Sequence, residues 1–349
     1  MITRKSLLEK AVKPIPNFAR LELEFLGTSS AQATHTRNVS ALALNFHTGS
    51  FLFDCGEGTT RQLLKAQCRL RDLEAVFITH LHGDHFYGLP GLAMRLMESR
   101  REVGATKIFG PKGLVRILGG MVPPTKRNVE IYEIDQSGPL YSNDSLKVAA
   151  YPIEHTAHCY GFVIEENPVD KDKRRLDRER IEQEYNLPPG PLYRQLSEGQ
   201  SVTLPDGRII NPEDVTLPGQ VGAAPRKVVI LGDTCNPRGI AEAAQGADVL
   251  VHEATCTNAE RTVALAKKHS TPGMAGDFAR HIQARNLILT HFSPRESLEG
   301  VMRTRTATSG GEHERMQVMR TQAMETFKSP NVFTAHDFWT FQVPPPRAA

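Results

Sequence analysis

Short apolar segments that end in histidine, aspartate or glutamate recur along this chain, and their recurrence limits the possible folds more than any other feature. Five of them have the length of buried strands, namely residues 75–79, 147–153, 228–232, 249–252 and 285–291. Polar residues able to bind metals or transfer protons follow each segment directly. An α/β scaffold collects strand ends at one edge of its sheets, where active sites are commonly built. The chain is therefore expected to be an α/β protein whose site is assembled from strand ends.

Other segments extend this pattern toward the N-terminus. Residues 21–26 alternate apolar and acidic side chains and stop at a Gly-Thr-Ser-Ser loop, as a half-buried strand would. Residues 41–46 and 51–54 bracket a short turn, which predicts a hairpin. Residues 91–101 have the apolar spacing of an amphipathic helix. Strands and helices are thus predicted to alternate through most of the chain.

Composition and charge exclude some classes of protein. Apolar residues make up 40% of the 349-residue chain, and 42 basic against 39 acidic residues leave a formal net charge of +3. Bulk charge therefore does not predict a nucleic-acid binder, and a polyanion would have to bind a local patch. The 5 cysteines form no C-x-x-C pair, which argues against a disulfide framework or a zinc knuckle. No apolar run reaches the roughly 18 residues of a membrane helix and no secretory signal is present, so a cytoplasmic protein is expected.

Two segments differ in composition from the rest. Residues 1–20 are basic and end in a Pro-rich stretch, which predicts an N-terminal extension, with an organellar transit segment as the alternative. Residues 166–222 combine alternating charges with a Pro/Gly segment and the hairpin signal Asp206-Gly207. We predict that residues 166–222 are an inserted arm, and that residues 21–165 and 223–349 together form the main domain.

The densest chemical signal is the loop after residues 75–79, which reads His80-Leu81-His82-Gly83-Asp84-His85. It places four possible metal ligands within six residues. Imidazole and carboxylate groups suit zinc, and their close spacing in a loop can direct them at two neighbouring ions. A chance cluster of polar residues would not explain the histidine and aspartate residues at the other strand ends. A metal site is therefore predicted at this edge of the sheets.

The loop carries the H-x-H-x-D-H signature of the metallo-β-lactamase superfamily, and within it the chain resembles the ribonuclease Z family. Further segments match motifs of that family in the same order: residues 53–59, the turn around His155, Gly232-Asp233-Thr234, His252-Glu253-Ala254-Thr255, His269-Ser270-Thr271 and Thr290-His291. The match covers roughly residues 21–342. The resemblance implies a four-layer αβ/βα sandwich, with two mixed sheets face to face, helices outside and metals at one edge.

The resemblance also implies which residues would hold two zinc ions. The expected ligands are His80, His82 and His155 for one ion, Asp84, His85 and His291 for the other, and Asp233 as a bridge. His155 and His158 lie in the same turn and spacing alone leaves the choice open, but the family pattern selects His155. Two neighbouring ions can lower the pKa of a shared water and clamp both oxygens of an in-line phosphoryl displacement.

Proton transfer and substrate contacts are implied in the same way. Asp84 would accept a proton as general base, while His269, oriented by Glu253, would protonate the leaving 3′ oxygen. The family loop P-x-K-x-R-N keeps only its last two residues here, and this departure leaves the position of the cut open. The expected substrate-binding residues are Arg37 and Asn38 in this loop, Ser293 and Arg295 at the scissile phosphate, and Gly190 and Pro191 in the arm. His252 is expected behind the metal ligands.

The function implied by the resemblance is endonucleolytic removal of the 3′ trailer from precursor tRNA, by attack of hydroxide on a phosphodiester, leaving a 3′-hydroxyl. A homodimer and an arm that grips the tRNA away from the metals follow from the resemblance alone. Basic residues between positions 171 and 180 could contact phosphates, although acidic neighbours nearly cancel their charge.

Three alternatives to this function are a two-zinc hydrolase of a small ester, lactone or thioester, a 3′→5′ exoribonuclease, and a non-catalytic tRNA-binding protein. The small-molecule hydrolase would need neither a basic arm nor His269 as an acid. An intact set of metal ligands argues against the non-catalytic protein, whereas the sequence does not exclude the exoribonuclease.

Overall fold

The structure is a computed structural model that describes residues 20–98, 104–120, 128–167, 176–188, 190–216, 224–294 and 310–345. The chain divides into two compact units. The larger unit comprises Leu21–Glu165 and Lys227–Val343, and the smaller comprises Glu166–Arg226 with the chain ends Met1–Arg20 and Pro344–Ala349. Among the described residues no helix is both long and apolar enough to cross a membrane.

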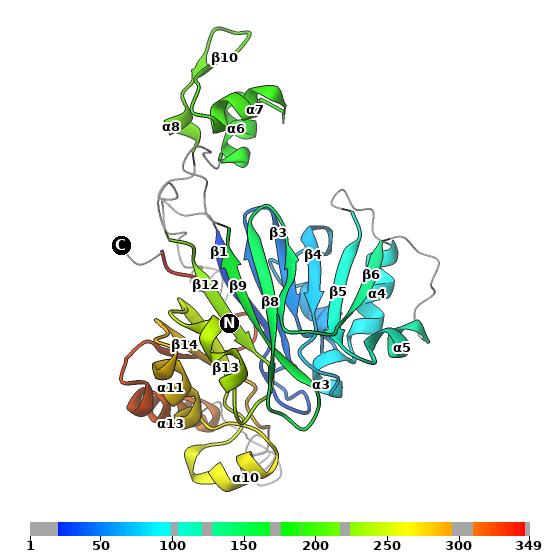
Figure 1. The fold of residues 1–349 in the computed structure, drawn as a ribbon, viewed down its shortest axis with the longest axis vertical. Coiled ribbons are helices and arrows are strands. Elements are labelled where there is room, and N and C mark those ends of the chain that lie inside the picture. Colours follow the sequence, from blue (N-terminus) through cyan, green and yellow to red (C-terminus); the bar gives the residue numbers. More distant parts are fainter. Residues whose placement is uncertain are drawn as a thin grey trace, which may run out of the picture. The chain divides into compact units, whose positions relative to one another are not determined.

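The larger unit is built on two seven-stranded sheets of mixed direction (Figure 1). The first has the order β16-β1-β2-β3-β4-β5-β6, with β1 Leu21–Gly27, β2 Ala41–Phe46, β3 Gly49–Phe53, β4 Leu73–Phe77, β5 Thr106–Pro111, β6 Val129–Ile134 and β16 Thr340–Gln342. The second has the order β15-β14-β13-β12-β9-β8-β7, with β7 Gly138–Ser142, β8 Leu146–Ile153, β9 Cys159–Glu166, β12 Lys227–Leu231, β13 Val249–Glu253, β14 Leu287–Thr290 and β15 Val332–Thr334. The predicted hairpin forms from β2 and β3, although β3 begins at Gly49 and the turn is correspondingly shorter.

A shared apolar core holds the two sheets face to face. Phe53 and Phe77 of the first sheet pack against Phe162 of the second, with ring centroids 5.6 and 5.5 Å apart. Leu44 and Val251 belong to the same cluster of buried side chains. Because each strand turns alternate residues to opposite faces, the remaining apolar residues of both sheets point outward to the helices.

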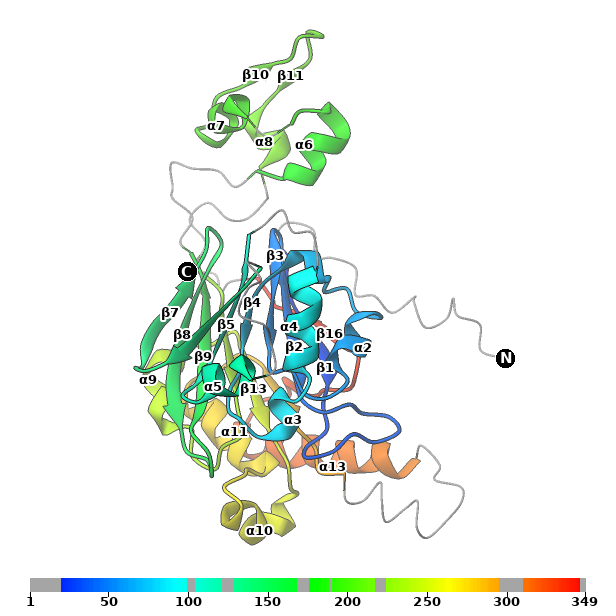
Figure 2. The same cartoon turned by 90° about the vertical axis from the view of Figure 1, so that its right-hand side faces the viewer.

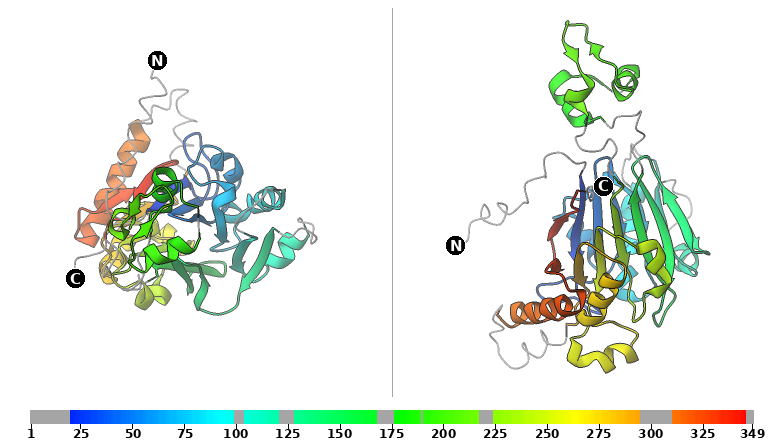
Figure 3. Two further views of the ribbon diagram at one scale, coloured as in Figure 1. Left: turned by 90° about the horizontal axis from the view of Figure 1, so that it is seen from above. Right: turned by 60° about the vertical axis from the view of Figure 1, so that its left-hand side comes forward.

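Helices cover both outer faces and complete four layers. On the first sheet lie α2 Thr59–Leu63, α4 Leu89–Glu98 and α5 Leu114–Gly119, as Figure 2 shows for α2 and α4. On the second lie α9 Ala241–Ala244, α11 Pro272–His281 and α13 Gly310–Phe327; the last two pack against each other (Figure 3). The remaining helical segments of the larger unit are η1 Leu70–Asp72, α3 Gly83–Phe86, η2 Arg238–Ile240, η3 Asn258–Glu260 and α10 Arg261–Ala266. This layer order confirms the predicted sandwich.

Parallel pairing brings the functional strand ends to one edge of each sheet. In the first sheet β3, β4 and β5 run parallel, and in the second β12, β13 and β14 do. A close backbone approach fixes the loops there, since a Cβ on Gly56 would lie 2.3 Å from the carbonyl oxygen of Asp84. Only glycine fits at this position without displacing the loop that carries the predicted ligands.

The described part of the smaller unit has an apolar core of its own. Its elements are α6 Arg178–Tyr185, α7 Pro191–Ser197, β10 Val202–Thr203, β11 Ile209–Ile210 and α8 Pro212–Val215. β10 and β11 pair as the hairpin predicted around Asp206-Gly207, with Gly207 at φ 86°. Ile181, Leu196 and Val215 are fully buried within this core. Residues 1–19 and the predicted phosphate-contacting side chains of Lys171, Lys173, Arg174, Arg175 and Arg178 lie outside the part described.

Candidate metal centre

The predicted metal ligands gather where the two sheets end. His80, His82, Asp84 and His85 follow β4, His155 follows β8, Asp233 follows β12 and His291 follows β14. The first sheet thus supplies the H-x-H-x-D-H loop, and the second supplies the remaining three ligands. Within this set the side chains form overlapping groups whose ligand atoms lie within 4.8 Å of one another.

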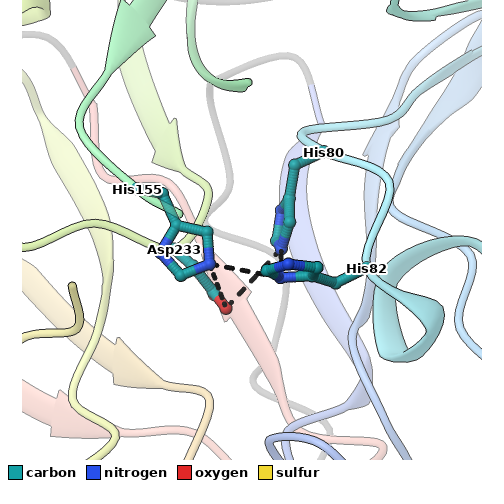
Figure 4. A group of neighbouring side chains, drawn as sticks. All are labelled: His80, His82, His155 and Asp233. Atoms are coloured by element: carbon teal, nitrogen blue, oxygen red, sulfur yellow. Dashed lines mark hydrogen bonds and ion pairs between the residues drawn. The ribbon is translucent and has the colours of Figure 1, made fainter. Parts of the chain in front are cut away.

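One group comprises His80, His82, His155 and Asp233 (Figure 4). His82 Nδ1 lies 3.0 Å from His80 Nε2 and 3.2 Å from His155 Nε2. Asp233 Oδ2 lies 3.7 Å from His80 Nε2 and 3.9 Å from His155 Nε2. Three imidazole nitrogens and one carboxylate oxygen therefore surround a common point.

A second group comprises Asp84, His85 and His291. The Nε2 atoms of His85 and His291 are 3.2 Å apart, and His291 Nε2 is 3.3 Å from Asp84 Oδ2. Asp233 Oδ2 lies 3.5 Å from His85 Nε2 and 3.4 Å from His291 Nε2. One oxygen of Asp233 is therefore close to the ligand atoms of both groups.

The spacing of these nitrogens fits tetrahedral metal coordination. Ligands about 2.0–2.1 Å from a zinc ion at tetrahedral angles are separated from one another by about 3.3 Å. The imidazole pairs of the two groups, at 3.0 to 3.2 Å, come close to this value. The donor set and its geometry thus suit a divalent metal.

Hydrogen bonds behind the rings fix which nitrogen faces the centre. His155 Nδ1 donates to the carbonyl oxygen of Lys268 at 2.9 Å, and His85 Nδ1 donates to a carboxylate oxygen of Asp54 at 2.7 Å. Because carbonyl and carboxylate oxygens only accept, each Nδ1 carries a proton, and Nε2 is the ring nitrogen that faces the centre and could bind a metal.

Two residues that support this arrangement were given no role in the sequence analysis. Asp54 accepts hydrogen bonds from the backbone and hydroxyl of Thr79 at 2.8 and 2.9 Å, besides its bond to His85. Thr255 Oγ1 lies 2.9 Å from Nδ1 of His291. Both stand inside motifs that follow buried strands, so their position at a strand end was the available signal.

Burial and charge set the protonation states of the ligands, which suit a metal at His80, His155 and Asp233 but leave a proton on His85. Burial lowers the pKa of His80 well below its ordinary value, and it lowers the pKa of His155 as well. Burial opposes the charged forms of Asp233 and His85, but neighbouring opposite charges outweigh it. His291 and His85 hold the pKa of Asp233 well below its usual range, while Asp233 and Asp54 raise the pKa of His85. A metal ion would displace the proton from His85 on binding.

Beside these groups, half-buried His269 forms an ion pair with buried Glu253. His269 Nδ1 lies 2.8 Å from Glu253 Oε1 and 3.8 Å from Asp233 Oδ2. Glu253 is held in turn by the backbone amide of Thr234, which donates to its Oε1 at 2.9 Å. Burial opposes protonation of His269, but the hydrogen bond and charge of Glu253 outweigh it and raise the pKa of His269 to about 9. The imidazole therefore holds a proton at neutral pH.

The predicted substrate-binding residues fall in different environments. The Ser293 amide donates to the carbonyl oxygen of Thr255 at 3.2 Å, which places Ser293 beside the site. The Asn38 side-chain amide donates to the carbonyl oxygen of Glu57 at 2.9 Å. Gly190 and Pro191 begin α7 in the smaller unit, and Arg295 lies outside the described residues.

The guanidinium of Arg37 is buried and engaged within the protein. Its Nη1 donates to Thr28 Oγ1 and to the carbonyl oxygen of Ala335, each at 2.7 Å, and its Nε pairs with Glu312. The guanidinium also lies over the Phe292 ring, 4.8 Å from the centroid. These contacts hold the loop that contains Arg37, and the sequence did not reveal them because every partner but Thr28 lies far along the chain.

The two remaining histidines of the motifs lie apart from the metal ligands. His158 is exposed, whereas His155 in the same turn is buried in the first group. His252 is buried with its ring 6.1 Å from Phe278, and its Nδ1 donates to the carbonyl oxygen of Glu253 at 2.7 Å. His252 thus packs toward α11 and belongs to neither group.

Comparison with known proteins finds likenesses over nearly the whole chain. The profile of a family described as Anti-Pycsar protein Apyc1 matches residues 21–185. A ribonuclease Z from Ligilactobacillus salivarius (strain UCC118) is 37% identical over 334 residues, covering 93% of this chain and 98% of the relative. The structure of human tRNase Z, short form, is 25% identical with a TM-score of 0.59, covering 93% of this chain and 99% of that one. The metallo-β-lactamase fold protein YhfI from Bacillus subtilis is 14% identical with a TM-score of 0.62, covering 92% and 99%.

Proposed function

The chain belongs to the ribonuclease Z family of tRNA 3′-processing endoribonucleases, and we propose that it cleaves precursor tRNA with two zinc ions held by its paired ligand groups. The observation that carries this proposal is the position of Asp233 Oδ2 between the two groups, with the His269–Glu253 pair beside it. Two zinc ions there would lower the pKa of an attacking water and neutralise charge on the phosphoryl oxygens of an in-line displacement.

Asp84 is the proposed general base. Burial opposes its charge, but the hydrogen bond from His291 and the charge of His85 keep its pKa well below the usual range. The carboxylate is therefore ionised at neutral pH and can accept a proton from the attacking water. Its position within the second group, with Oδ2 3.3 Å from His291 Nε2, supports this role.

His269 is the proposed general acid. As the bond between phosphorus and the 3′ oxygen breaks, the leaving oxygen gains negative charge, and the imidazolium can donate its proton to it. The tRNA then ends in a 3′-hydroxyl and the released trailer keeps the phosphate. Glu253 stabilises the imidazolium before transfer and fixes its orientation, which the 2.8 Å contact supports.

Further parts of the proposal concern binding and assembly. Arg37, Asn38, Ser293 and Arg295 would bind the substrate around the cut. Residues 166–222, with Gly190 and Pro191, would form an arm that holds the tRNA. The separate apolar core of the smaller unit supports an arm that folds as a module. A homodimer is proposed from the family resemblance, and a cytoplasmic location from the reduced state expected of the cysteines.

A precursor tRNA labelled at the 5′ end of the body and at the 3′ end of the trailer tests the proposal. Endonucleolytic cleavage should yield one shortened tRNA with a 3′-hydroxyl and one intact labelled trailer. Asp233→Ala serves as the inactive control, and exposed Asp277→Ala on α11 serves as the matched active one. Release of mononucleotides would instead indicate the exoribonuclease. No RNA cleavage, with hydrolysis of lactone or thioester substrates, would indicate the small-molecule hydrolase.

A further inference from the structure

A backbone amide from the loop after β1 contacts the proposed general base. The N–H of Ala31 donates to Asp84 Oδ2 at 2.6 Å. The same oxygen lies 3.3 Å from His291 Nε2 and 3.6 Å from His85 Nε2. The amide therefore holds the carboxylate oxygen that faces His85 and His291, the other two residues of the second group.

The backbone at Ala31 adopts an unfavourable conformation to make this contact. Its φ of 61° lies in the left-handed region, which side chains with a Cβ avoid. Such a conformation persists where surrounding contacts determine it, and it is found at functional sites. Here the Ser30 amide donates to the carbonyl oxygen of Phe292 at 3.0 Å, and Ser29 Oγ donates to the carbonyl oxygen of Gln32 at 2.7 Å. The chain is thus pinned on both sides of Ala31.

The other end of the same loop is anchored in α13. Glu312 accepts hydrogen bonds from Arg37 Nε and from Thr36 Oγ1, the second at 2.9 Å. Arg37 also binds Thr28 at the start of the loop, so the two ends of residues 28–37 are tied together. The ends of the loop are therefore held in place, and the Ala31 amide within it donates to Asp84.

We propose that residues 28–37 form a positioning loop for Asp84, in which the Ala31 amide fixes one carboxylate oxygen toward the second ligand group and the Arg37–Glu312 pair holds the loop in place. The amide removes the rotational freedom of the carboxylate, so Asp84 is oriented before a metal or substrate binds. This inference deepens the proposed function and rests on Asp84 being a metal ligand and base.

The test replaces the Ala31 N–H alone. Lactic acid incorporated at position 31 turns the amide into an ester, which keeps the methyl group but removes the donor and puts an oxygen against Asp84. Ala31→Gly is the matched control, since it keeps the donor and relieves the left-handed conformation. The ester should lower kcat for bis(p-nitrophenyl) phosphate by about 10- to 100-fold, with KM within about twofold of wild type. It should weaken Co²⁺ binding, followed by its absorption spectrum, over a similar range.

Ala31→Gly should match the wild type in both quantities, and an ester variant with wild-type kcat and Co²⁺ affinity would overturn the proposal. A loss in Ala31→Gly equal to that of the ester would also overturn it, because the donor would then not be the cause. If the wild type itself neither bound Co²⁺ nor hydrolysed the phosphodiester, the proposed function would fail and not this inference alone.

A side-chain variant keeps the proposal testable should the ester fold poorly. Glu312→Gln weakens the anchor without touching the ligand groups, and exposed Glu314→Gln on the same helix is its control. Glu312→Gln should show a smaller loss in the same two measurements at unchanged KM, and Glu314→Gln none. Equal behaviour of the two variants would argue against the anchoring role of Glu312.

Discussion

Replacing Glu253 with glutamine should lower the pKa of His269 and thereby make the rate of RNA cleavage fall as the pH rises. Glu253 lies 2.8 Å from His269 Nδ1 and raises the pKa of that imidazole to about 9 against the opposing effect of burial. Glu253→Gln keeps the size of the side chain and removes its charge. Burial is then opposed by the charge of Asp233 alone, 3.8 Å away, so the pKa of His269 should fall toward its ordinary value of about 6.5.

The size of the effect follows from the fraction of protonated imidazole. An acid of raised pKa stays protonated until the pH passes about 9, whereas in the variant the proton is lost as the pH passes about 6.5. The wild-type rate should exceed that of the variant by about 1.3-fold at pH 6, about 10-fold at pH 7.5 and about 75-fold at pH 8.5. These ratios hold for a variant pKa of about 6.5; a lower pKa would enlarge each ratio, and a higher one, held up by Asp233, would reduce it.

Single-turnover cleavage of precursor tRNA between pH 6 and pH 9 measures this ratio. Glu260→Gln is the matched control, since Glu260 caps the neighbouring helical turn away from His269 and its loss should leave the profile unchanged. Hydrolysis of bis(p-nitrophenyl) phosphate should change little, because nitrophenolate departs without much protonation. A loss on RNA that is constant with pH would refute the reasoning and would point to a structural role for Glu253.

Three further changes probe the metals, the acid and the arm. Elemental analysis should find about two zinc ions per chain, and Asp233→Ala should lose them together with all hydrolysis of RNA and of small phosphodiesters; active protein with only trace metal would contradict this. His269→Ala should slow RNA cleavage by about 10²- to 10⁴-fold at unchanged metal content, with a smaller defect on bis(p-nitrophenyl) phosphate. A Gly/Ser linker in place of residues 167–222 removes the basic residues of the arm and keeps the buried Arg226–Glu166 pair. It should raise KM for precursor tRNA, weaken the salt dependence of tRNA binding and leave hydrolysis of the small substrate unchanged. Unchanged tRNA cleavage would remove the arm from the proposal.

The strands that bear the site could be predicted because their signal is local. β4 and β12 are fully or nearly fully buried apolar runs that stop just before polar residues, and a short window of sequence contains that contrast. β6 and β7 went unpredicted, since their residues are mostly half-exposed and carry no comparable contrast. β16 has only three residues and gains its pairing from β1 at the opposite end of the chain.

The environment of individual site residues was harder to foresee. Arg37 sits in a motif that suggested a substrate contact, yet Glu312 and Ala335, which bind it, lie 275 and 298 positions away. The bond from Ala31 to Asp84 uses a backbone group, which every residue except proline has, so the residue type gives no warning of it. Local patterns indicated which residues could do chemistry, whereas contacts between distant segments decide how each is held.

The division of the ligands between the two sheets has a consequence for the synthesis and the stability of the protein. His85 and His291 lie 206 positions apart, so a growing chain cannot close the second ligand group until almost all of it has left the ribosome. Bound ions would then stabilise the association of the two halves of the sandwich. Metal binding that requires ligands from both halves adds its free energy to that of their docking. A cell short of the bound divalent metal would therefore contain a looser and more easily degraded protein, whose abundance would follow the metal supply.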